Sequence, residues 1–423
     1  MSLSRRQWLE ICGGAAAAPA LSARAAAPAA ADDVPAAVAS LRPMTDGVSS
    51  ITTEEHRERI ARAQKLLRES GLDALVLASG TSLTYFTGAR WGQSERLFAA
   101  VLTREGEPAW VTPAFERQRA LEQVRMGSDV RAWEDDESPY ALVAGILRDR
   151  GAASGRVGIE ETVPFVFADA IGKAAPAARL ESGTPVTAGC RVIKDAHEVA
   201  LMRRANQITV AAHRAVFASL REGMTQAEAS RLSADAHRRL GMTGGALVLF
   251  GADAAFPHGT EKPRPLARGD VVLIDGGGRL HGYASDITRT AVFGAPPTER
   301  QRTVWNAVRR AQQAAFEAAR PGVEAQALDA AARKVIEDAG FGPGYKYFTH
   351  RVGHGIGMDG HEWTYLVRGN ATKLRPGMCF SDEPGIYVPG ELGVRHEDIL
   401  VITDAGADNM TKWTGPPEEP AVV

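Results

Sequence analysis

The sequence predicts two folded parts: an α/β domain, followed by an α+β domain whose two halves are related to each other. Three observations support this. A chain of 423 residues is long for one domain, and a hydrophobic content of 44% is ample for sizeable cores. Short apolar segments alternate with helical segments in the first half of the chain. In the second half, one helical pattern recurs at the same length.

The N-terminus has the pattern of a targeting segment. Ser4–Leu9 (SRRQWL) is typical of twin-arginine export, and an alanine-rich stretch leads to a small-residue cleavage site at Ala23–Ala25. We therefore expect a signal over residues 1–30, an Ala/Pro-rich linker over residues 31–50, and a periplasmic or secreted protein. Glu10 departs from the usual basic residue, so the alternative is an Ala/Pro-rich tail on a cytoplasmic protein.

Residues 51–187 are expected to form the α/β domain. Thr52–Glu55 (TTEE) offers an N-cap with acids in the first helical turn, and Gly71 ends the helix. Short buried strands should follow it, over Ala74–Ala78, Phe98–Leu102 and Pro108–Thr112. No catalytic residue types cluster in this domain.

Residues 188–412 are expected to form the second domain, before a tail over residues 413–423. A long helix should run from Asp195 through Leu220. The pattern beginning at Gly223 and ending at Gly241 then recurs from Gly322 to Gly340, each time followed by a histidine and acids. Two facing halves would place a site in the cleft between them. The alternative is a chance likeness of two amphipathic helices.

Four acids and one histidine in the last third of the chain have side chains suited to metal binding: Asp275, Asp286, His354, Glu383 and Glu397. No cysteine lies beside them, which argues against a structural zinc site. An oxygen-rich set with one nitrogen suits Mn²⁺, Co²⁺, Fe²⁺ or Zn²⁺. Two cations about 3.5–4 Å apart need bridging carboxylates, and four acids are about enough. The sequence therefore predicts a pair of divalent ions.

Local patterns place these residues on strand ends and turns. Val271–Asp275 and Tyr283–Thr290 read as an antiparallel hairpin, so Asp275 and Asp286 should meet across the pair. Two like charges opposite each other are costly unless a cation lies between them. The alternative, a hairpin with solvated acids, is disfavoured by the isoleucines beside both aspartates. Glycines flank His354, Glu383 lies in a Glu-Pro-Gly turn, and Glu397 precedes an apolar strand.

Composition excludes several classes of function. The net charge of −2 gives no reason to expect nucleic acid or an anionic membrane as a partner. Cys190 and Cys379 do not make a disulfide framework. No apolar run approaches the length of a membrane-spanning helix.

Taken together, these motifs resemble those of the pita-bread metallopeptidases: prolidase, aminopeptidase P, methionine aminopeptidase and the non-metal relative creatinase. The segments that carry the resemblance are Pro257–Gly259, Asp275, Ser285–Thr290, His354–Gly357, His361–Glu362, Glu383–Gly385 and Arg395–Asp398. It covers about Cys190 to Asp404, and more loosely the first domain. The phrases EPGIY and GVRHED favour the proline-specific branch. The resemblance thus implies a pita-bread catalytic domain with an internal pseudo-two-fold repeat.

The resemblance also implies roles for individual residues. Asp275 would hold one ion, His354 and Glu383 the other, and Asp286 and Glu397 would bridge both, with a nucleophilic hydroxide between the ions. Glu383 would relay the proton to the leaving nitrogen. His258 and His361 would stabilise the oxyanion, and Arg395 would orient the glutamates. Mn²⁺ is the first candidate for the two divalent metals, with Co²⁺ and Zn²⁺ as alternatives.

The implied activity is that of an Xaa-Pro dipeptidase acting on small peptides with proline at the second position, in a homodimer. The alternatives are an Xaa-Pro aminopeptidase, a creatinase-like C–N hydrolase and a non-catalytic binding module. One departure stands out. Relatives often carry an aromatic hydroxyl near the position of Gly244 and Gly245, and a Gly-x-Asn element where this chain has Ala252–Ala254.

Overall fold

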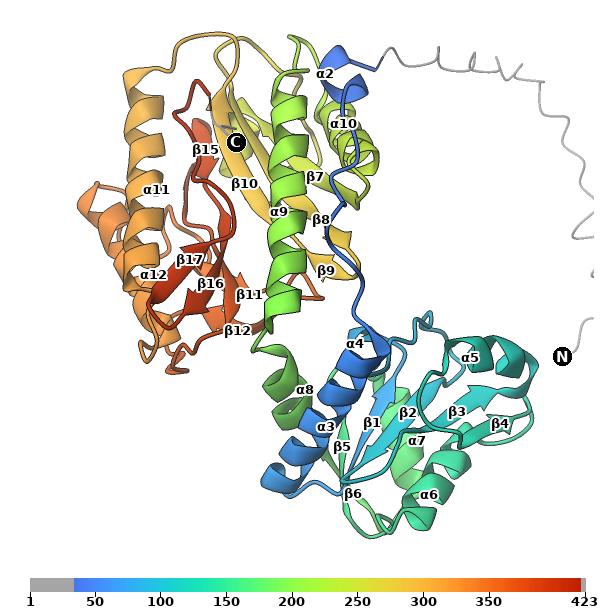
Figure 1. Ribbon diagram of the computed structural model, residues 1–423. Helices are drawn as coiled ribbons and strands as arrows, with labels where there is room; N and C mark the ends of the chain where they lie inside the picture. Colours follow the sequence, from blue (N-terminus) through green and yellow to red (C-terminus); the bar gives the residue numbers. More distant parts are fainter. Residues whose placement is uncertain (1–33, 420–423) are drawn as a thin grey trace, which may run out of the picture. The chain divides into compact units, whose positions relative to one another are not determined.

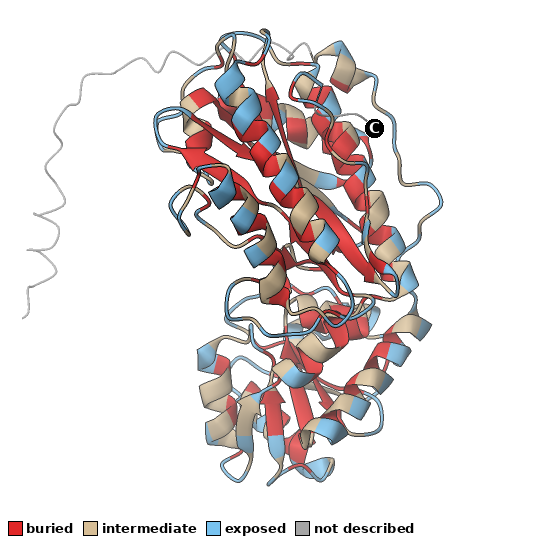
Figure 2. Cartoon of the chain, turned by 90° about the vertical axis from the view of Figure 1, so that its left-hand side faces the viewer, coloured by how far each residue is buried: buried red, intermediate tan, exposed pale blue. Residues whose placement is uncertain are grey.

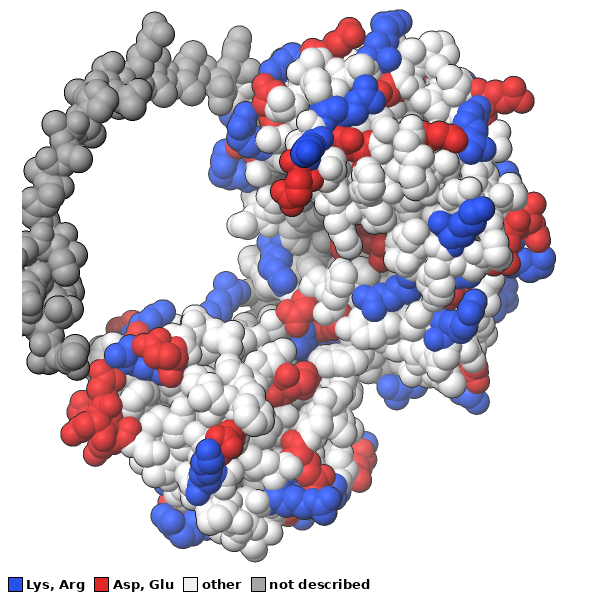
Figure 3. Space-filling view, turned by 180° about the vertical axis from the view of Figure 1, so that it is seen from behind, with Lys and Arg blue, Asp and Glu red and all other residues white. Residues whose placement is uncertain are grey.

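The structure is a computed structural model that describes residues 34–419, and the residues from Ala36 onward form one compact unit (Figure 1). The predicted export signal lies outside the described residues. Among the helices described, none combines the length and the apolar character needed to cross a bilayer. On the face shown in Figure 3, acidic and basic side chains are interspersed rather than gathered into one large patch.

The first part of the chain is an α/β domain built on a six-stranded mixed sheet with the order β4-β3-β2-β1-β5-β6. Its strands are β1 (Ala74–Ala78), β2 (Ala99–Thr103), β3 (Ala109–Pro113), β4 (Val130–Trp133), β5 (Arg156–Ile159) and β6 (Arg179–Ser182). Its helices are α3 (Thr53–Ser70), α4 (Thr81–Thr87), α5 (Arg117–Gln123), α6 (Pro139–Asp149), α7 (Phe165–Ala174) and α8 (Thr184–Arg191), with a 3-10 turn η1 (Ala114–Glu116). Every residue of β1, β2 and β3 is buried, whereas the edge strands β4 and β6 are mostly partly exposed (Figure 2). The three predicted strands are confirmed to within one residue.

The first helix of this domain begins and ends where its sequence signals predict. The Thr52 side chain accepts a hydrogen bond from the Glu55 backbone N–H, and the Glu55 carboxylate accepts one from the Thr52 N–H, which completes a capping box. Gly71 ends α3 in the left-handed conformation with φ of 71°, which a residue with a side chain rarely adopts.

The second part contains two helix pairs, each packed on its own sheet (Figure 1). The first half consists of α9 (Ala196–Phe217), α10 (Gln226–Arg239), β7 (Thr243–Phe250), η2 (Gly251–Ala255), β8 (Val271–Leu280), β9 (Tyr283–Ala284) and β10 (Ile287–Val292). The second half consists of α11 (Glu299–Ala318), α12 (Ala325–Asp338), β11 (Gly353–Gly355), β12 (Glu362–Leu366), β13 (Cys379–Asp382), β16 (Asp398–Thr403) and β17 (Gly406–Asn409), with the hairpin β14 (Gly385–Val388) and β15 (Leu392–Arg395). The sheet orders are β10-β8-β7 and β12-β11-β13-β16-β17.

The two halves show the repeat that the sequence predicts. Thr225 caps α10 and Glu324 precedes α12 at the equivalent position. The two sheets join at one isolated antiparallel bridge, in which Thr288 and Glu397 exchange backbone hydrogen bonds of 3.3 and 3.2 Å. The predicted fold, an α/β domain followed by an α+β domain with an internal repeat, is confirmed. The long helix predicted to reach Leu220 ends three residues earlier, at Phe217.

The strand register corrects one detail of the predicted hairpin. Thr288, not Asp286, lies directly opposite Asp275, and Ile287 lies opposite Gly276. Asp286 therefore stands just before β10, two residues from the position facing Asp275. The two aspartates still approach each other, because residues two apart on a strand share a face.

Segments predicted as a linker and a tail are partly packed against the second domain. In the linker, α2 (Ala36–Ala39) buries Val38 completely, and the Met44 backbone N–H donates to the Leu240 carbonyl. In the tail, Trp413 packs edge-to-face on Phe316, with ring centroids 5.1 Å apart. Apolar side chains in both segments cover surface that would otherwise be exposed to water.

Candidate metal centre

The five predicted ligands converge from both halves of the second domain. Asp275 lies in β8 and Asp286 just before β10, whereas His354 lies in β11, Glu383 follows β13 and Glu397 precedes β16. Together with His361, they form three sets of potential ligand atoms, each with all members within 4.8 Å of one another. The sets are Asp275, Asp286 and Glu397; His354, Glu383 and Glu397; and Asp286, His354 and His361. The three sets share members, so they describe one connected cluster.

The charge balance of this cluster favours bound cations. Among the described residues, Arg395 is the one arginine or lysine paired with these carboxylates, and its Nη2 lies 2.6 Å from Asp275 Oδ2. Burial and the nearby Asp275 charge raise the pKa of Asp286 to about 7, and burial with Asp286 raises the pKa of Glu397 well above its ordinary value. Two divalent ions would neutralise this repulsion, and a set of four carboxylates with an imidazole has the donor chemistry they require.

His354 is oriented for binding through its Nε2 atom. Its Nδ1 lies 3.1 Å from the carbonyl of Gly355, so an Nδ1–H donates there and leaves Nε2 facing Glu383, 3.2 Å from Oε1. Ser381 Oγ accepts from the His354 backbone N–H and donates to Glu383 Oε1 at 3.0 Å. Burial raises the pKa of Glu383, but His354, together with His350 and Arg395, outweighs it and lowers that pKa to about 2.

Thr288 and Tyr387 complete the centre, although the sequence analysis assigned them no role. Thr288 Oγ1 lies 2.6 Å from Asp275 Oδ1 and 2.7 Å from Glu397 Oε2, and it accepts from Arg395 Nε at 3.2 Å. The Tyr387 hydroxyl lies 2.7 Å from Arg395 Nη1 and 2.8 Å from His350 Nε2. Both residues lie in the motifs on which the family resemblance rests. The sequence therefore indicated that these segments belong to the site, but it did not indicate which residues the two side chains contact.

Arg395 makes contacts that differ from the prediction. It was expected to orient the glutamates, but its guanidinium contacts Asp275, Thr288 and Tyr387 and reaches Glu397 only through the Thr288 hydroxyl. The backbone bridge between Thr288 and Glu397 causes this, because it places the threonine between the arginine and the glutamate.

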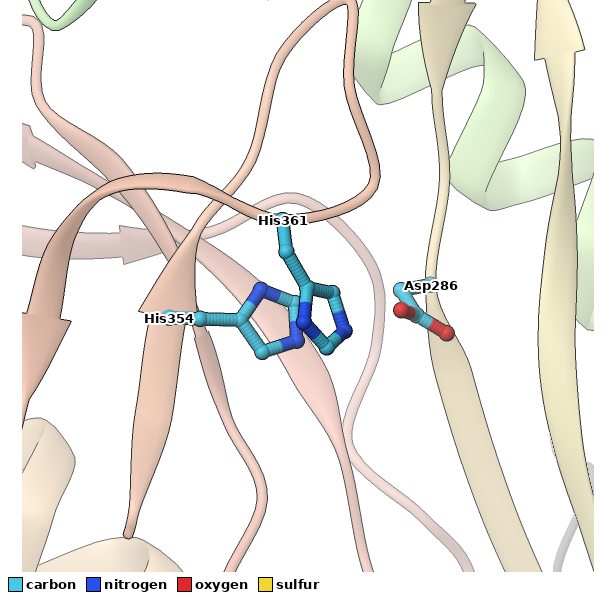
Figure 4. Close-up of side chains that lie close together, drawn as sticks. All are labelled: Asp286, His354 and His361. Carbon is cyan, nitrogen blue, oxygen red and sulfur yellow. The ribbon is translucent and has the colours of Figure 1, made fainter. Parts of the chain in front are cut away.

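His258 and His361 both line a cavity of about 630 Å³ that contains the cluster. The His361 ring stacks on His354 with centroids 3.7 Å apart, and Figure 4 shows both rings with the Asp286 carboxylate beside them. Burial and the His354 charge lower the pKa of His361, so its ring is neutral at neutral pH. By distance, His361 could also contribute a ligand atom, a role the sequence analysis did not give it.

Comparison with known proteins agrees with this geometry. Residues 200–404 match the family model for metallopeptidase family M24, and residues 59–193 match the creatinase/prolidase N-terminal domain. The crystal structure of dipeptidase PepE from Mycobacterium ulcerans superposes with a TM-score of 0.80 at 36% identity, covering 87% of this chain and 98% of that chain. The chain belongs to metallopeptidase family M24. It is therefore a peptidase with the pita-bread fold.

Two further relatives place this M24 peptidase on the prolidase branch. The Xaa-Pro dipeptidase of Lactobacillus delbrueckii subsp. lactis is 35% identical over 356 residues, which cover 83% of this chain and 95% of the relative. A recombinant prolidase from Thermococcus sibiricus has a TM-score of 0.77 at 31% identity, covering 86% of this chain and 98% of that chain. The family resemblance seen in the sequence is confirmed.

The lining of the M24 cavity includes basic and apolar side chains as well as the acids. Besides the acids, its lining residues include Tyr345, Thr349, His350, Arg351 and Val367. The Arg351 guanidinium lies over the ring of Tyr365, 4.1 Å from its centroid, which restrains the arginine. The cavity therefore contains a restrained positive charge in addition to the carboxylate cluster.

Close strand packing explains why this M24 peptidase has no aromatic residue at Gly244. A Cβ atom there would lie 2.6 Å from the Gly277 carbonyl oxygen and 2.8 Å from the ring of His237. At Gly245 a Cβ would meet only Ala234, at 3.8 Å. The Asp253 carboxylate, where relatives have a Gly-x-Asn element, accepts hydrogen bonds from Gln226 and from the Arg264 backbone, so it fixes the turn after β7.

Proposed function

We propose that this chain is a dinuclear metal-dependent dipeptidase that hydrolyses Xaa-Pro bonds. The observation that carries the proposal is the convergence of four carboxylates and one imidazole, from two sheets, in one cavity of about 630 Å³. The names of relatives support the substrate class, since one is an Xaa-Pro dipeptidase and another a prolidase.

The residues predicted as ligands would hold the two ions: Asp275, Asp286, His354, Glu383 and Glu397. When bound, such ions polarise the scissile carbonyl and lower the pKa of water toward neutrality. Thr288 and Arg395 fix the orientation of Asp275 and Glu397, which keeps the donor atoms in place before any ion arrives.

Glu383 is the proposed proton carrier. Its carboxylate lies beside His354 Nε2 at 3.2 Å and Ser381 Oγ at 3.0 Å, and in the proposal it takes up a proton at one of its oxygens. Its side chain lines the cavity and is 15% exposed, which leaves one edge open to substrate. From there it would pass the proton to the leaving nitrogen of proline.

His258 and His361 are the proposed donors to the developing oxyanion. Both line the cavity and are exposed to it in the free protein. A neutral imidazole N–H placed beside the carbonyl oxygen stabilises the tetrahedral state more than the ground state, because negative charge develops on that oxygen. The stacking of His361 on His354 limits its motion.

Specificity for proline follows from the form of its peptide bond. The Xaa-Pro bond is a tertiary amide without an N–H, so an enzyme cannot grip it as an extended strand. Tyr345 and Val367 offer apolar surface for the ring, and Arg351 offers positive charge for a terminal carboxylate. A carboxylate clamp of this kind favours dipeptides over longer peptides.

Hydrolysis of Ala-Pro against Ala-Pro-Ala tests the proposal. Chelator-stripped protein resupplied with Mn²⁺ should cleave the dipeptide, and an Asp286→Ala variant should not. Preference for the tripeptide would instead identify an Xaa-Pro aminopeptidase, and equal cleavage of Ala-Ala would remove the proline requirement. No cleavage of any peptide by the metal-loaded protein would overturn the peptidase proposal.

Three finer points are proposed with the activity. Mn²⁺ is the proposed native metal, to be checked by elemental analysis of protein purified without added metal. A homodimer is the proposed assembly, to be checked by sedimentation. Export through the twin-arginine signal is proposed for residues 1–30, to be checked by fractionating cells that express the full chain and an Arg5→Lys, Arg6→Lys variant.

A further inference from the structure

A second feature of the molecule is a groove, away from the metal centre, whose charged side chains are all basic. Two adjoining cavities of about 300 and 450 Å³ share Thr84, Arg90 and Met358 and shape this basic groove. Its ionisable lining residues are His56, Arg59, Arg90, Arg125, Arg279, His281 and Tyr283. No described Asp or Glu lines either cavity, and neither shares a residue with the cavity of the metal centre.

Three arginines of the basic groove form no ion pair with any carboxylate of residues 34–419: Arg90, Arg125 and Arg279. Within the described residues, the one hydrogen bond from these three guanidinium groups is weak, from Arg279 Nη1 to the Gly282 carbonyl at 3.4 Å. Arg96, by contrast, pairs with both Glu95 and Asp135 in the same domain. Unpaired guanidinium groups around one hollow create a positive potential that a bound anion would neutralise.

The floor of the basic groove carries a buried, incompletely satisfied arginine. Arg59 is 1% exposed and pairs with Glu198 at 3.3 Å, while its Nη2 donates to the Tyr283 hydroxyl at 2.7 Å. Its Nε has no hydrogen-bond partner in the described structure. A buried donor without a partner is costly, and the same guanidinium brings a positive charge to the lining of the groove. His56, 5% exposed, lies beside it.

We propose that the basic groove binds a small oxyanion carrying two or more negative charges. The guanidinium fork donates two parallel hydrogen bonds to a phosphate or carboxylate group, which is the geometry such anions require. Three arginines without internal counterions can contribute without first breaking an ion pair.

Such binding would join two parts of the chain. His56, Arg90 and Arg125 come from the first domain, whereas Arg279 and His281 come from the β8–β9 hairpin that leads to Asp286. An anion held by both sides stabilises the folded protein, because it binds the native state and not the unfolded chain. This inference does not depend on the proposed peptidase activity.

Calorimetric titration of the metal-loaded full chain with inorganic phosphate, and separately with succinate, tests the proposal. A titration with sodium chloride at the same ionic strength is the reference, because it measures the effect of charge screening without specific binding of the anion. We expect saturable binding with at least a tenfold loss of affinity in an Arg90→Gln, Arg125→Gln double variant. Arg310→Gln, which changes an exposed arginine on α11 that is also without an ion pair in the described chain, should bind as the wild type does.

The outcomes separate the possibilities cleanly. Tighter binding of phosphate than succinate would assign the groove to phosphate-type anions, and the reverse would assign it to dicarboxylates. Binding that persists unchanged in the double variant would place the anion elsewhere, for example at the metals, and would overturn the proposal. Absence of binding, or an equal response to chloride, would overturn it as well.

Discussion

A single hydroxyl proton lies between two acids at the centre of the site. Thr288 Oγ1 is within 2.7 Å of both Asp275 and Glu397, yet it can donate to one of them only. Arg395 Nε occupies its acceptor side. The threonine thus couples the two halves of the molecule through its side chain as well as through the backbone bridge.

Replacing Thr288 with valine should weaken metal binding. The substitution keeps the shape of the side chain but leaves Asp275 and Glu397 without their shared donor, so we expect roughly a 10–100-fold loss of metal affinity. Calorimetric titration of the metal-free proteins with Mn²⁺ measures the affinity. Thr288→Ser should recover most of the affinity, and equal affinity in the valine variant would show that the hydroxyl has no role.

Two neighbouring glycines should respond differently to the same substitution. A methyl group at Gly244 would overlap the Gly277 carbonyl, whereas one at Gly245 meets Ala234 at an ordinary contact distance. We expect Gly244→Ala to lower the free energy of unfolding by about 1–3 kcal/mol, the usual cost of overpacking. Gly245→Ala is the matched control and should change it little. Denaturant unfolding of both variants would decide, and equal losses would contradict the argument.

At the scale of elements, the segment between β11 and β12 is held by the first domain. Arg191, at the end of α8, pairs with Asp359 at 2.6 Å and with Glu362, and Lys194 lies 3.0 Å from Glu362. Thr81 of α4 donates to Asp359. The contacts of Asp359 are partly buried and those of Glu362 are buried, and together they flank His361 in the sequence, so they restrain the segment that carries the proposed oxyanion donor.

Removing Arg191 should therefore act on catalysis through His361. Arg191→Met leaves Glu362 buried with one cation, and we expect a fall in kcat of about tenfold, with a stability loss of about 3–5 kcal/mol typical of a broken buried ion pair. The measurement is kcat on Ala-Pro in wild-type and His361→Ala backgrounds. If Arg191 acts by positioning His361, its removal should cost much less kcat in the second background.

A matched control separates this effect from general electrostatics. Arg300→Gln removes an exposed ion pair with Glu391, which should be worth no more than about 1 kcal/mol, and should leave kcat unchanged. A full tenfold loss for Arg191→Met in both backgrounds would mean that the arginine does not act through His361.

At the scale of the whole molecule, the acids of one sheet face the acids and histidine of the other. Without metal, these carboxylates repel each other, so they favour separation of the two halves. Under the proposed function, the same residues would bind common ions and so hold the halves together. The stability of the second domain should therefore depend on metal more strongly than on any single apolar contact at the centre.

The sign of one substitution should reverse with metal content. In stripped protein, Asp286→Asn removes a like charge next to Asp275 and should raise the midpoint of thermal unfolding. In Mn²⁺-loaded protein it removes a ligand and should lower the midpoint relative to wild type, because ion binding stabilises the native state by mass action. Thermal unfolding of the wild type and of the variant, each with and without Mn²⁺, gives the four midpoint temperatures to compare. The same sign in both conditions would argue against an ion at Asp286.

Local patterns in the sequence determined the elements and the donor set. The capping box at Thr52, the glycine stop at Gly71 and the repeated helix starts depend on contacts within a few residues, so they can be read along the chain. The identity of the four acids and one histidine also needs no structure, because ligand chemistry depends on residue type. Their order matched a known family, which supplied the fold.

Only the tertiary structure decided how these residues meet. Strand pairing places Thr288 opposite Asp275. Two other contacts join residues more than one hundred positions apart: that of Arg395 with Asp275, and that of Arg191 with Glu362 beside His361. The basic groove likewise gathers arginines from distant segments. Such contacts arise when separate elements pack, and local sequence does not specify the partner that packing will bring.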